Sequence, residues 1–242
     1  MNEQDWKSRT ELLLGREKME ILESAHVLIA GLGGVGGYVA EQLCRAGLGT
    51  LTLVDNDSVN PSNRNRQIIA LVSTEGDKKT EALEKRLKDI NPEIHLNIED
   101  TFLDEKNISK LLQNRVDYIA DAIDTLSPKV ALLSEGVKLG FRIVSSMGSG
   151  GKTDPSQVIV CDIEKSHHCK FATLVRKYLH RLNVRGGIEV VFSPERVSKE
   201  SLLITDGSGN KRSMIGTISY MPAVFGCFMA ATIIRGLLAD KQ

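Results

Sequence analysis

The glycine-rich run from Gly31 to Gly36, Gly-Leu-Gly-Gly-Val-Gly, is the feature that most constrains the fold. It follows residues 26–30, a short continuous apolar stretch of the kind that forms a buried strand. Residues 38–45 then carry a helical pattern that ends before Gly47, and residues 51–54 form a second apolar strand. Strand, glycine turn, helix and strand in this order predict a βαβ unit, and therefore a parallel sheet.

The same alternation continues along the chain. Helices are predicted at residues 11–22, 77–90, 107–114, 128–139 and 170–182, and further strands at 94–98, 118–121, 142–146, 158–160 and 188–192. We therefore expect an α/β fold, a Rossmann-like nucleotide-binding core with a mostly parallel sheet that antiparallel C-terminal strands extend. The length of 242 residues suits a single domain, with the core at residues 1–150 and a C-terminal extension at 151–242.

Charge and apolar content narrow the class of protein. Thirty-one basic and 31 acidic residues balance, so no overall basic field attracts nucleic acid. The amino terminus lacks the apolar core of a signal peptide, and we expect a cytoplasmic protein. Residues 221–238 are the most apolar stretch, but they include Pro222, two glycines and Arg235, which favours a buried helix over a membrane span.

The glycine run has the spacing of a phosphate-binding turn. Gly31, Gly33 and Gly36 match G-x-G-x-x-G between a strand and a helix, where main-chain N–H groups can meet phosphate oxygens. Asp55, which ends the second strand, is placed to accept hydrogen bonds from a ribose. A tight turn without ligand is the alternative, and the context favours a nucleotide.

Further polar residues follow the carboxyl ends of the predicted strands, where ligands of such sheets bind. The set comprises Asp57, Asn63, Arg66, Gln67 and Lys79 after the second strand, and Asp121 and Asp124 after the fourth. Arginine grips phosphate oxygens in bidentate fashion, and carboxylates are hard ligands for Mg²⁺. Taken singly, these residues are typical of solvated lysines and helix caps. Together they favour metal-bound ATP over NAD.

These motifs resemble a known family. GLGGVG, DND with NRNRQ, Lys79 and DAID look like the adenylation core of the ThiF/MoeB/HesA superfamily, relatives of ubiquitin-activating enzymes, over about residues 9–150. SPKVAL, GSGGKTDPSQV, DIEKS, VVFSPE and GTISYMPAVFG are similar to the tRNA threonylcarbamoyladenosine dehydratases, which extends the resemblance over almost the whole chain. The resemblance implies a homodimer that uses ATP and Mg²⁺ to adenylate a threonyl carboxylate on a modified adenosine next to the tRNA anticodon, followed by ring closure and release of AMP.

The resemblance also implies roles for individual residues. It assigns Gly31, Gly33, Gly34 and Gly36 to the phosphate turn, Asp55 to ribose, Asp57, Asn63, Arg66, Gln67 and Lys79 to the phosphates or the transition state, and Asp124 to magnesium. Arg66, Lys79, Asp124 and Arg9 are the expected catalytic residues. Arg9 corresponds to an arginine that reaches the neighbouring subunit's ATP in relatives; a solvated charge at a helix end is the alternative. Asp121 is as well explained by a structural role.

The second interpretation is an adenylating enzyme of the MoeB/ThiF type, whose substrate is the C-terminus of a ubiquitin-like or sulfur-carrier protein. Many such relatives bear two CxxC pairs for zinc, and this chain has none; its cysteines are Cys44, Cys161, Cys169 and Cys227. Cys169 lies beside His167 and His168, but adjacent histidines on a helix face different ways. A nicotinamide-dependent redox protein is the third interpretation. A sulfur-transfer or carrier-protein partner is compatible with the first two interpretations.

A basic window is hidden in the neutral total. Residues 165–185 contain no acid, and the candidate tRNA-binding side chains in and beyond the window are Lys165, Lys170, Arg176, Lys177, Arg181, Lys211 and Arg212. A solvated helix face is the alternative for the window. The last two residues belong to the segment 205–212, which resembles a mobile loop and could close over the modified base.

Overall fold

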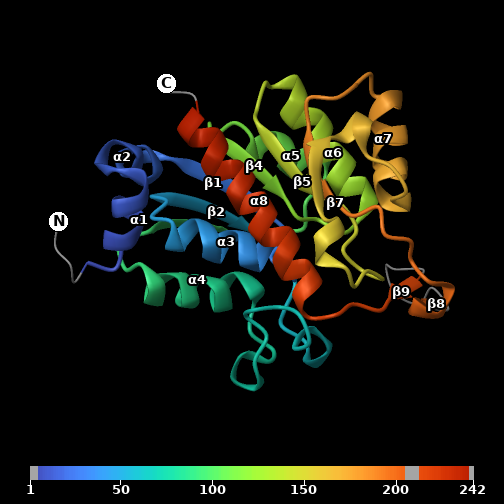
Figure 1. Ribbon diagram of the computed structural model, residues 1–242, viewed down its shortest axis with the longest axis horizontal. Helices are drawn as coiled ribbons and strands as arrows, with labels where there is room; N and C mark the ends of the chain where they lie inside the picture. Colours follow the sequence, from blue (N-terminus) through green and yellow to red (C-terminus); the bar gives the residue numbers. More distant parts are fainter. Residues whose placement is uncertain (1–4, 205–212, 240–242) are drawn as a thin grey trace.

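The computed structural model describes residues 5–204 and 213–239 of the chain (Figure 1). A seven-stranded sheet runs through them in the order β3-β2-β1-β4-β5-β7-β6. The strands are β1 (His26–Ala30), β2 (Thr50–Val54), β3 (His95–Glu99), β4 (Tyr118–Asp121), β5 (Ile143–Ser146), β6 (Ile159–Asp162) and β7 (Glu189–Phe192). Pairing is parallel from β3 to β7, and only β6 runs antiparallel to its neighbour. The predicted fold class is confirmed, with β7 joining the parallel set.

Helices cover both faces of this sheet. The helices α2 (Arg16–Ser24), α3 (Gly36–Arg45), α4 (Lys79–Ile90) and α8 (Tyr220–Ala239) pack on one face, and α5 (Glu105–Leu111), α6 (Leu126–Lys138) and α7 (Lys170–Arg181) on the other. The central strand shows why: Val27 and Ile29 enter the first core cluster, and Leu28 and Ala30 enter the second. Successive side chains of a strand point to opposite faces, so a strand covered on both sides is apolar throughout.

The predicted helix at residues 11–22 is wrong as a single element. It consists of α1 (Ser8–Leu14) and α2, which Gly15 separates with a φ of 85°. That backbone conformation favours glycine and ends a helix. The apolar periodicity continues across the break, which explains why the pattern indicated one helix.

A small hairpin lies outside the sheet, formed by β8 (Leu202–Ile204) and β9 (Ser213–Ile215). The sequence pattern did not predict it. The segment 205–212, predicted to be a mobile loop, lies outside the described residues, as do Lys211 and Arg212.

Helix α8 is long and apolar enough to cross a membrane by length and composition alone. Its inner face belongs to the protein core instead, through Met221, Phe225, Met229 and Ile233, all fully buried. The prediction of a buried helix is confirmed for this face. Figure 1 shows α8 crossing the front of the molecule, so its outer face remains uncovered.

Candidate nucleotide-binding site

The glycine turn links β1 to α3 at the point where the sheet changes direction. Strand β1 pairs with β2 on one side and β4 on the other, and the helices that follow β1 and β4 pack on opposite faces of the sheet. Open α/β sheets bind ligands in a crevice at such a switch point, at the carboxyl ends of the strands. Gly31 has a φ of 88°, and a Cβ there would lie 2.8 Å from the carbonyl oxygen of Ala122. A Cβ on Gly36 would lie 1.8 Å from the carbonyl oxygen of Gly31. Both positions therefore require glycine for the turn itself.

Asp55 braces this turn from the end of β2. Its Oδ2 accepts a hydrogen bond from the main-chain N–H of Leu32 at 2.6 Å, and its Oδ1 accepts one from the N–H of Asp57 at 2.8 Å. The side chain is only 9% exposed. Each carboxylate oxygen can accept a second hydrogen bond, so bracing leaves capacity for a ribose hydroxyl.

Lys79 opens α4 next to the same two carboxylates. Its Nζ lies 2.7 Å from Oδ2 of Asp57 and 3.8 Å from Oδ1 of Asp55. The residue is 5% exposed, which is rare for lysine unless it is paired. Lys79 is therefore not a solvated lysine of the kind that usually occupies a first helical turn. Its ammonium group is held by Asp57 beside Asp55, at the mouth of the crevice.

The segment after β2 brings an arginine and a glutamine against the turn. A Cβ on Gly34 would lie 3.3 Å from Cγ of Arg66, and a Cβ on Gly33 would lie 3.7 Å from Nε2 of Gln67. Gln67 is 7% exposed, and its Oε1 has no hydrogen-bond partner among the described residues. A buried unpaired carbonyl is costly, and a bound ligand that donates a hydrogen bond would satisfy it.

Local hydrogen bonds shape this segment. Asn63, which is 9% exposed, accepts the N–H of Asn60 through Oδ1 and so caps the short helix η1 (Pro61–Asn63). Nη1 of Arg66 donates to the carbonyl oxygen of Ser62 at 3.0 Å and to Oδ1 of Asn65 at 2.8 Å. Asn63 therefore has a structural role that its sequence position did not reveal, and the Arg66 guanidinium is hydrogen-bonded within its own segment while Cγ of Arg66 lies beside Gly34.

The end of β4 supplies the last group of charged residues. Asp121 and Lys129 form an ion pair in which both side chains are fully buried, and Ser145 donates to the same carboxylate. Burial lowers the pKa of Lys129, and the Asp121 carboxylate opposes that shift. Asp124 lies three residues further on, is exposed, and accepts a hydrogen bond from the hydroxyl of Thr125 at 3.3 Å. The buried aspartate is thus structural, and the exposed Asp124 lies in the turn that follows β4, at the carboxyl ends of the strands.

The donor set fits one kind of metal site. Residues 5–204 and 213–239 hold no group of three or more His, Cys, Asp or Glu side chains able to enclose a metal ion. Mg²⁺ bound to a nucleotide usually takes one or two protein carboxylates, with phosphates and waters completing its shell. Asp124 fits that arrangement as a single carboxylate at the strand ends.

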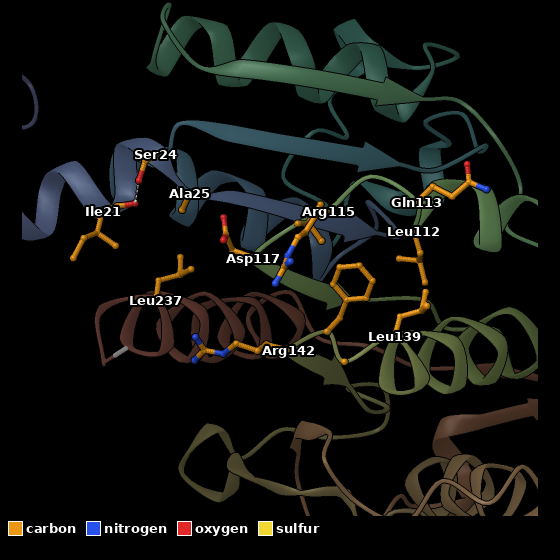
Figure 2. A pocket seen from close by; sticks show the side chains of 13 residues that line it. Ile21, Ser24, Ala25, Leu112, Gln113, Arg115, Asp117, Leu139, Arg142 and Leu237 are labelled. Carbon is orange, nitrogen blue, oxygen red and sulfur yellow. Dashed lines mark hydrogen bonds between the residues drawn. The ribbon is translucent and has the colours of Figure 1, made fainter. Parts of the chain in front are cut away.

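A pocket of about 570 Å³ lies at the other end of the strands from the glycine turn (Figure 2). Ala25, Asp117 and Arg142, which line it, directly precede β1, β4 and β5, and Leu237 comes from the end of α8. It therefore opens at the amino ends of the strands. Ligands of open α/β sheets bind at the carboxyl ends, so this pocket is separate from the nucleotide crevice.

Comparisons with known proteins indicate one family. The model of the ThiF family matches residues 8–242. A tRNA threonylcarbamoyladenosine dehydratase of Bacillus subtilis is 36% identical over 97% of this chain and 95% of its own length. The chain belongs to the ThiF family, on its tRNA threonylcarbamoyladenosine dehydratase branch. The resemblance read from the motifs is confirmed.

Solved structures of the same branch of the ThiF family extend this likeness to three dimensions. The crystal structure of Escherichia coli tRNA N6-threonylcarbamoyladenosine dehydratase in complex with ATP is 30% identical, superposes with a TM-score of 0.89, and covers 98% of this chain and 96% of that one. The complex of the same enzyme with AMP is 31% identical, with a TM-score of 0.88 and the same coverage.

Arg9 is the one expected catalytic residue of this ThiF-family chain that lies away from the crevice. It is exposed on α1, two residues after Lys7, whose ammonium pairs with Glu23 at 2.5 Å. A Cβ on Gly47 would touch Lys7, which places α1 near the amino ends of β1 and β2. A five-residue strand spans roughly 13–17 Å, so the length of the sheet separates Arg9 from the glycine turn of its own chain.

Helix α7 divides the basic window. Lys170, Lys177 and Arg181 are exposed at spacings of seven and four residues and share one face. Arg176 faces the protein, where its Nη1 donates to the carbonyl oxygens of Ile163 and Ser166, both at 3.0 Å. Lys165 is exposed before the helix. The structure therefore separates Arg176 from the other four candidate basic residues that it describes.

The cysteines are all free and scattered. Cys44 is buried, and desolvation raises the pKa of its thiol to about 11. Cys169 is buried as well, whereas Cys227 is exposed on α8. The rings of His167 and His168 meet edge to face, with centroids 5.3 Å apart. A thiol that stays protonated is a poor nucleophile, so Cys44 is a small apolar core residue.

Two residues next to the candidate site escaped the sequence interpretation. Lys129 lies in the apolar run Pro-Lys-Val, and its helical phase with the buried Val130 and Leu133 was the available signal. Asn65 donates to the carbonyl oxygen of Thr217 at 3.0 Å, which ties the arginine segment to the residues before α8. The two residues are 152 positions apart in the chain, so no local sequence pattern predicts the contact.

Proposed function

We propose that this protein catalyses the ATP-dependent cyclising dehydration of N6-threonylcarbamoyladenosine in tRNA, next to the anticodon. The observation that carries the proposal is the crevice itself, in which Arg66 and Gln67 lie against the glycine turn and Lys79 pairs with Asp57 beside Asp55, the carboxylate that braces the turn. Similarity over nearly the full length to dehydratases, one of them solved with ATP and with AMP, supports it. We place the enzyme in the cytoplasm with its tRNA substrate.

Adenylation is the first step. An oxygen of the threonyl carboxylate attacks the α-phosphorus of ATP, the bond to the β-phosphate oxygen breaks, and pyrophosphate leaves. Main-chain N–H groups of the glycine turn, with the positive end of α3, hold the phosphates. The cations of Arg66 and Lys79 neutralise the charge that builds up on the phosphate oxygens, and Asp55 orients the ribose. Asp57 keeps the Lys79 ammonium at the crevice mouth.

Ring closure follows on the adenylate. A nucleophilic atom of the same threonylcarbamoyl group attacks the activated carbonyl carbon, and AMP leaves with the oxygen that came from the carboxylate. Both reacting atoms belong to one substituent, so orientation supplies most of the rate enhancement. The mechanism needs no covalent nucleophile of the protein. The scattered cysteines, two of them buried, agree with a mechanism in which no cysteine takes part.

Magnesium belongs to the proposal as the counterion of the triphosphate. Asp124 would hold it, with phosphates and waters as the remaining ligands. When bound, the ion supplies positive charge that stabilises the departing pyrophosphate.

A homodimer is the proposed assembly, and two uncovered surfaces support it. None of the seven residues of α1 is buried, and Leu12 and Leu13 are 74% and 82% exposed. Helix α8 carries an outward stripe that is mostly apolar, formed by the exposed residues Cys227, Phe228, Ala231 and Arg235. Leu14 packs α1 against the core, while Leu12 and Leu13 present apolar surface that a second copy would bury.

The direction of α8 explains how a dimer would use Arg9. A Cβ on Gly34 would lie 3.0 Å from Pro222 at the start of α8, while Leu237 at its end reaches the amino edge of the sheet. If two copies pack their outward stripes antiparallel about a two-fold axis, the end of one α8 meets the start of the other. Helix α1 of one copy would then lie near the glycine turn of its partner, with Arg9 close to the partner's phosphates.

The exposed face of α7 is the proposed tRNA contact. Lys170, Lys177 and Arg181 line it, and the Arg181 guanidinium lies over the ring of Tyr178 at 4.9 Å. Basic side chains beside exposed aromatic rings suit phosphates and unstacked bases of a loop. Lys165 extends this face, and Lys211 and Arg212 belong to the proposal from sequence only.

Adenylation of a ubiquitin-like or sulfur-carrier protein is the second candidate function. The adenylation core suits either substrate, and exposed apolar residues of the β8–β9 region, including Leu203 and Ile215, would suit a protein partner. The dehydratase similarity over the whole chain favours the tRNA substrate.

Pyrophosphate exchange into ATP tests both functions. We expect exchange only with tRNA that bears threonylcarbamoyladenosine, and not with unmodified tRNA or with a carrier protein ending in Gly-Gly. Exchange with the carrier alone would establish the second function. Mass spectrometry of tRNA nucleosides from a deletion strain should show loss of the cyclic nucleoside, restored by the wild-type gene but not by a Lys79→Ala variant.

A further inference from the structure

A buried charged triangle lies beneath the connection between β4 and α6. Nζ of Lys129 lies 2.5 Å from Oδ2 of Asp121 and donates to Oγ of Ser145 at 3.1 Å. The serine hydroxyl donates in turn to Asp121 at 2.6 Å. All three residues are 0% exposed. The three side chains therefore form a closed ring of hydrogen bonds inside the core.

Stability alone does not account for this arrangement. Transferring an ammonium and a carboxylate from water to a protein interior carries a large desolvation penalty, and well-packed apolar residues of similar volume are often at least as stable. The position of the ion pair is therefore better explained by the segments that it holds together than by a gain in stability. Here it lies at the carboxyl ends of β4 and β5, the edge at which the sheet binds ligands.

The pair staples the two ends of one turn. Asp121 ends β4 and Lys129 lies in the first turns of α6, so residues 122–125 are closed between them. The other oxygen of Asp121 accepts the N–H of Ile123 at 3.1 Å, which fixes the turn from inside. Asp124 is the next residue, and its position follows from that of the turn.

The stapled turn also presses on the glycine turn. The N–H of Ala122 donates to the carbonyl oxygen of Ala30 at 2.8 Å, and the carbonyl oxygen of Ala122 lies 2.8 Å from the position that a Cβ of Gly31 would take. The methyl group of Ala122 lies 3.3 Å from the Cβ position of Gly36. The two turns that face the phosphates are therefore packed against each other and share one register.

We propose that Lys129 is a positioning residue: by closing the staple with Asp121 it holds the 122–125 turn so that Asp124 meets the metal-bound phosphates. The inference rests on the proposed function, because it assumes that ATP with Mg²⁺ occupies the crevice. It assigns Lys129 no contact with substrate. Its effect reaches the nucleotide through Asp121 and the turn.

The test uses a double variant that removes both charges together, Asp121→Leu with Lys129→Met. Removing both charges avoids an unpaired buried charge, and the loss of the acceptor for Ser145 and Ile123 should lower the melting temperature by less than about 10 °C. Calorimetric titration should show unchanged affinity for ATP in EDTA, because the glycine turn is intact. With Mg²⁺ present, the affinity for ATP should fall at least tenfold relative to wild type.

A matched control removes a different ion pair. Arg86 pairs with Glu41, a carboxylate that is 5% exposed between α3 and α4, away from the turn. The Arg86→Met variant should lose stability but keep the full Mg²⁺-dependent gain in ATP affinity. If the double variant also keeps that gain, or loses affinity equally with and without Mg²⁺, the positioning role is overturned. Absence of ATP binding by wild type would instead overturn the proposed function.

Hydrogen exchange of the unaltered protein decides the matter even if the double variant fails to fold. The amide of Ile123, held by Asp121, should exchange as slowly as the amides of Ile119 and Ala120 within β4. Exchange of the Ile123 amide at the rate of exposed turn amides, with β4 still protected, would show that the staple does not hold the turn.

Discussion

The Asp55 carboxylate accepts the main-chain N–H of Leu32 at 2.6 Å, so the second strand directly holds the loop of the glycine turn. The aspartate that was expected to bind ribose therefore also shapes the glycine turn, the proposed phosphate site. Under the proposed function its removal affects nucleotide binding in two ways, because the ribose loses its acceptor and the turn is loosened.

Asp55→Ala should consequently reduce both stability and nucleotide affinity. An unpaired buried N–H at Leu32 costs about 1–3 kcal/mol, and we expect ATP affinity to fall more than tenfold. Urea unfolding and calorimetric titration measure the two effects. Asp154→Ala is the control, since Asp154 accepts the N–H of Ser156 away from the crevice; it should lower stability without changing ATP affinity. Equal ATP affinity in the Asp55 variant would exclude its role at the site.

Gly33 and Gly36 should respond differently to alanine. A methyl group on Gly36 would collide with the carbonyl oxygen of Gly31 at 1.8 Å, so Gly36→Ala should fail to fold or melt far below wild type. A methyl group on Gly33 meets only Nε2 of Gln67, at an ordinary contact distance of 3.7 Å. Gly33→Ala should therefore fold normally and lose ATP affinity, because the methyl group occupies the space through which phosphates approach. Thermal melting and ATP titration separate the two outcomes, and wild-type affinity in Gly33→Ala would contradict this account.

The sequence predicted the sheet well because its signals are local. Residues 26–30, the glycine run and residues 51–54 form one βαβ unit, and each strand apart from the hairpin was recognised within about two residues. Gly15 was missed because apolar residues keep their spacing on both sides of the break. The hairpin strands are three residues each, too short to show a period.

The site was harder to predict, since its partners come from distant segments. The sequence correctly predicted that Lys79 and Asp57 lie close together at the carboxyl ends of the strands. The burial of Lys79 depends on packing that no local pattern encodes. Arg176 shows the reverse case: its charge suggested a tRNA contact, while its hydrogen bonds to the carbonyl oxygens of Ile163 and Ser166 give it a structural role. Charge patterns identify basic residues, and only the fold shows which of them are available.

His26 should make stability depend on pH between about 5 and 7. Burial lowers the pKa of its imidazole, whose Nε2 lies 2.8 Å from the hydroxyl of Thr52. The unfolded chain then binds a proton more readily than the folded one, so stability is complete above the unfolded pKa of about 6.5 and falls as the pH drops towards the folded value. Urea midpoints should decline from pH 7.5 to 5.5.

The decline should be smaller in His26→Gln and unchanged in His167→Gln, a control at an exposed histidine. Carboxylates with lowered pKa values, such as Glu41, change the free energy of unfolding only at more acidic pH. The change between pH 7.5 and 5.5 is therefore assigned to His26. An identical slope in wild type and His26→Gln would assign the effect elsewhere.

The face of α7 should carry salt-dependent tRNA binding. Lys170→Ala, Lys177→Ala and Arg181→Ala together should weaken tRNA affinity and reduce the slope of log affinity against log salt by about 0.7–0.9 for each phosphate that is no longer neutralised. ATP affinity should not change, because the helix lies on the far face of the sheet from α3. A triple variant at the exposed lysines 85, 106 and 110 removes the same charge elsewhere and should bind tRNA normally. Equal weakening by both triple variants would show that net charge, and not this face, determines binding.

Cys227 should report on the proposed dimer. It is exposed on the outward stripe of α8, not far from the middle of the helix, so two copies that pack antiparallel along this stripe bring their Cys227 side chains close together. A short bismaleimide should therefore yield a covalent dimer, which Cys227→Ser abolishes and Cys161→Ser does not. Phe228→Glu, which places a charge in the same stripe, should give monomers in sedimentation velocity and lower the rate of adenylation, because Arg9 would no longer reach a partner. Mixing it with an Arg9→Ala chain should restore no activity. A wild-type chain that sediments as a monomer at micromolar concentration, with full activity, would rule out both the dimer and the trans role of Arg9.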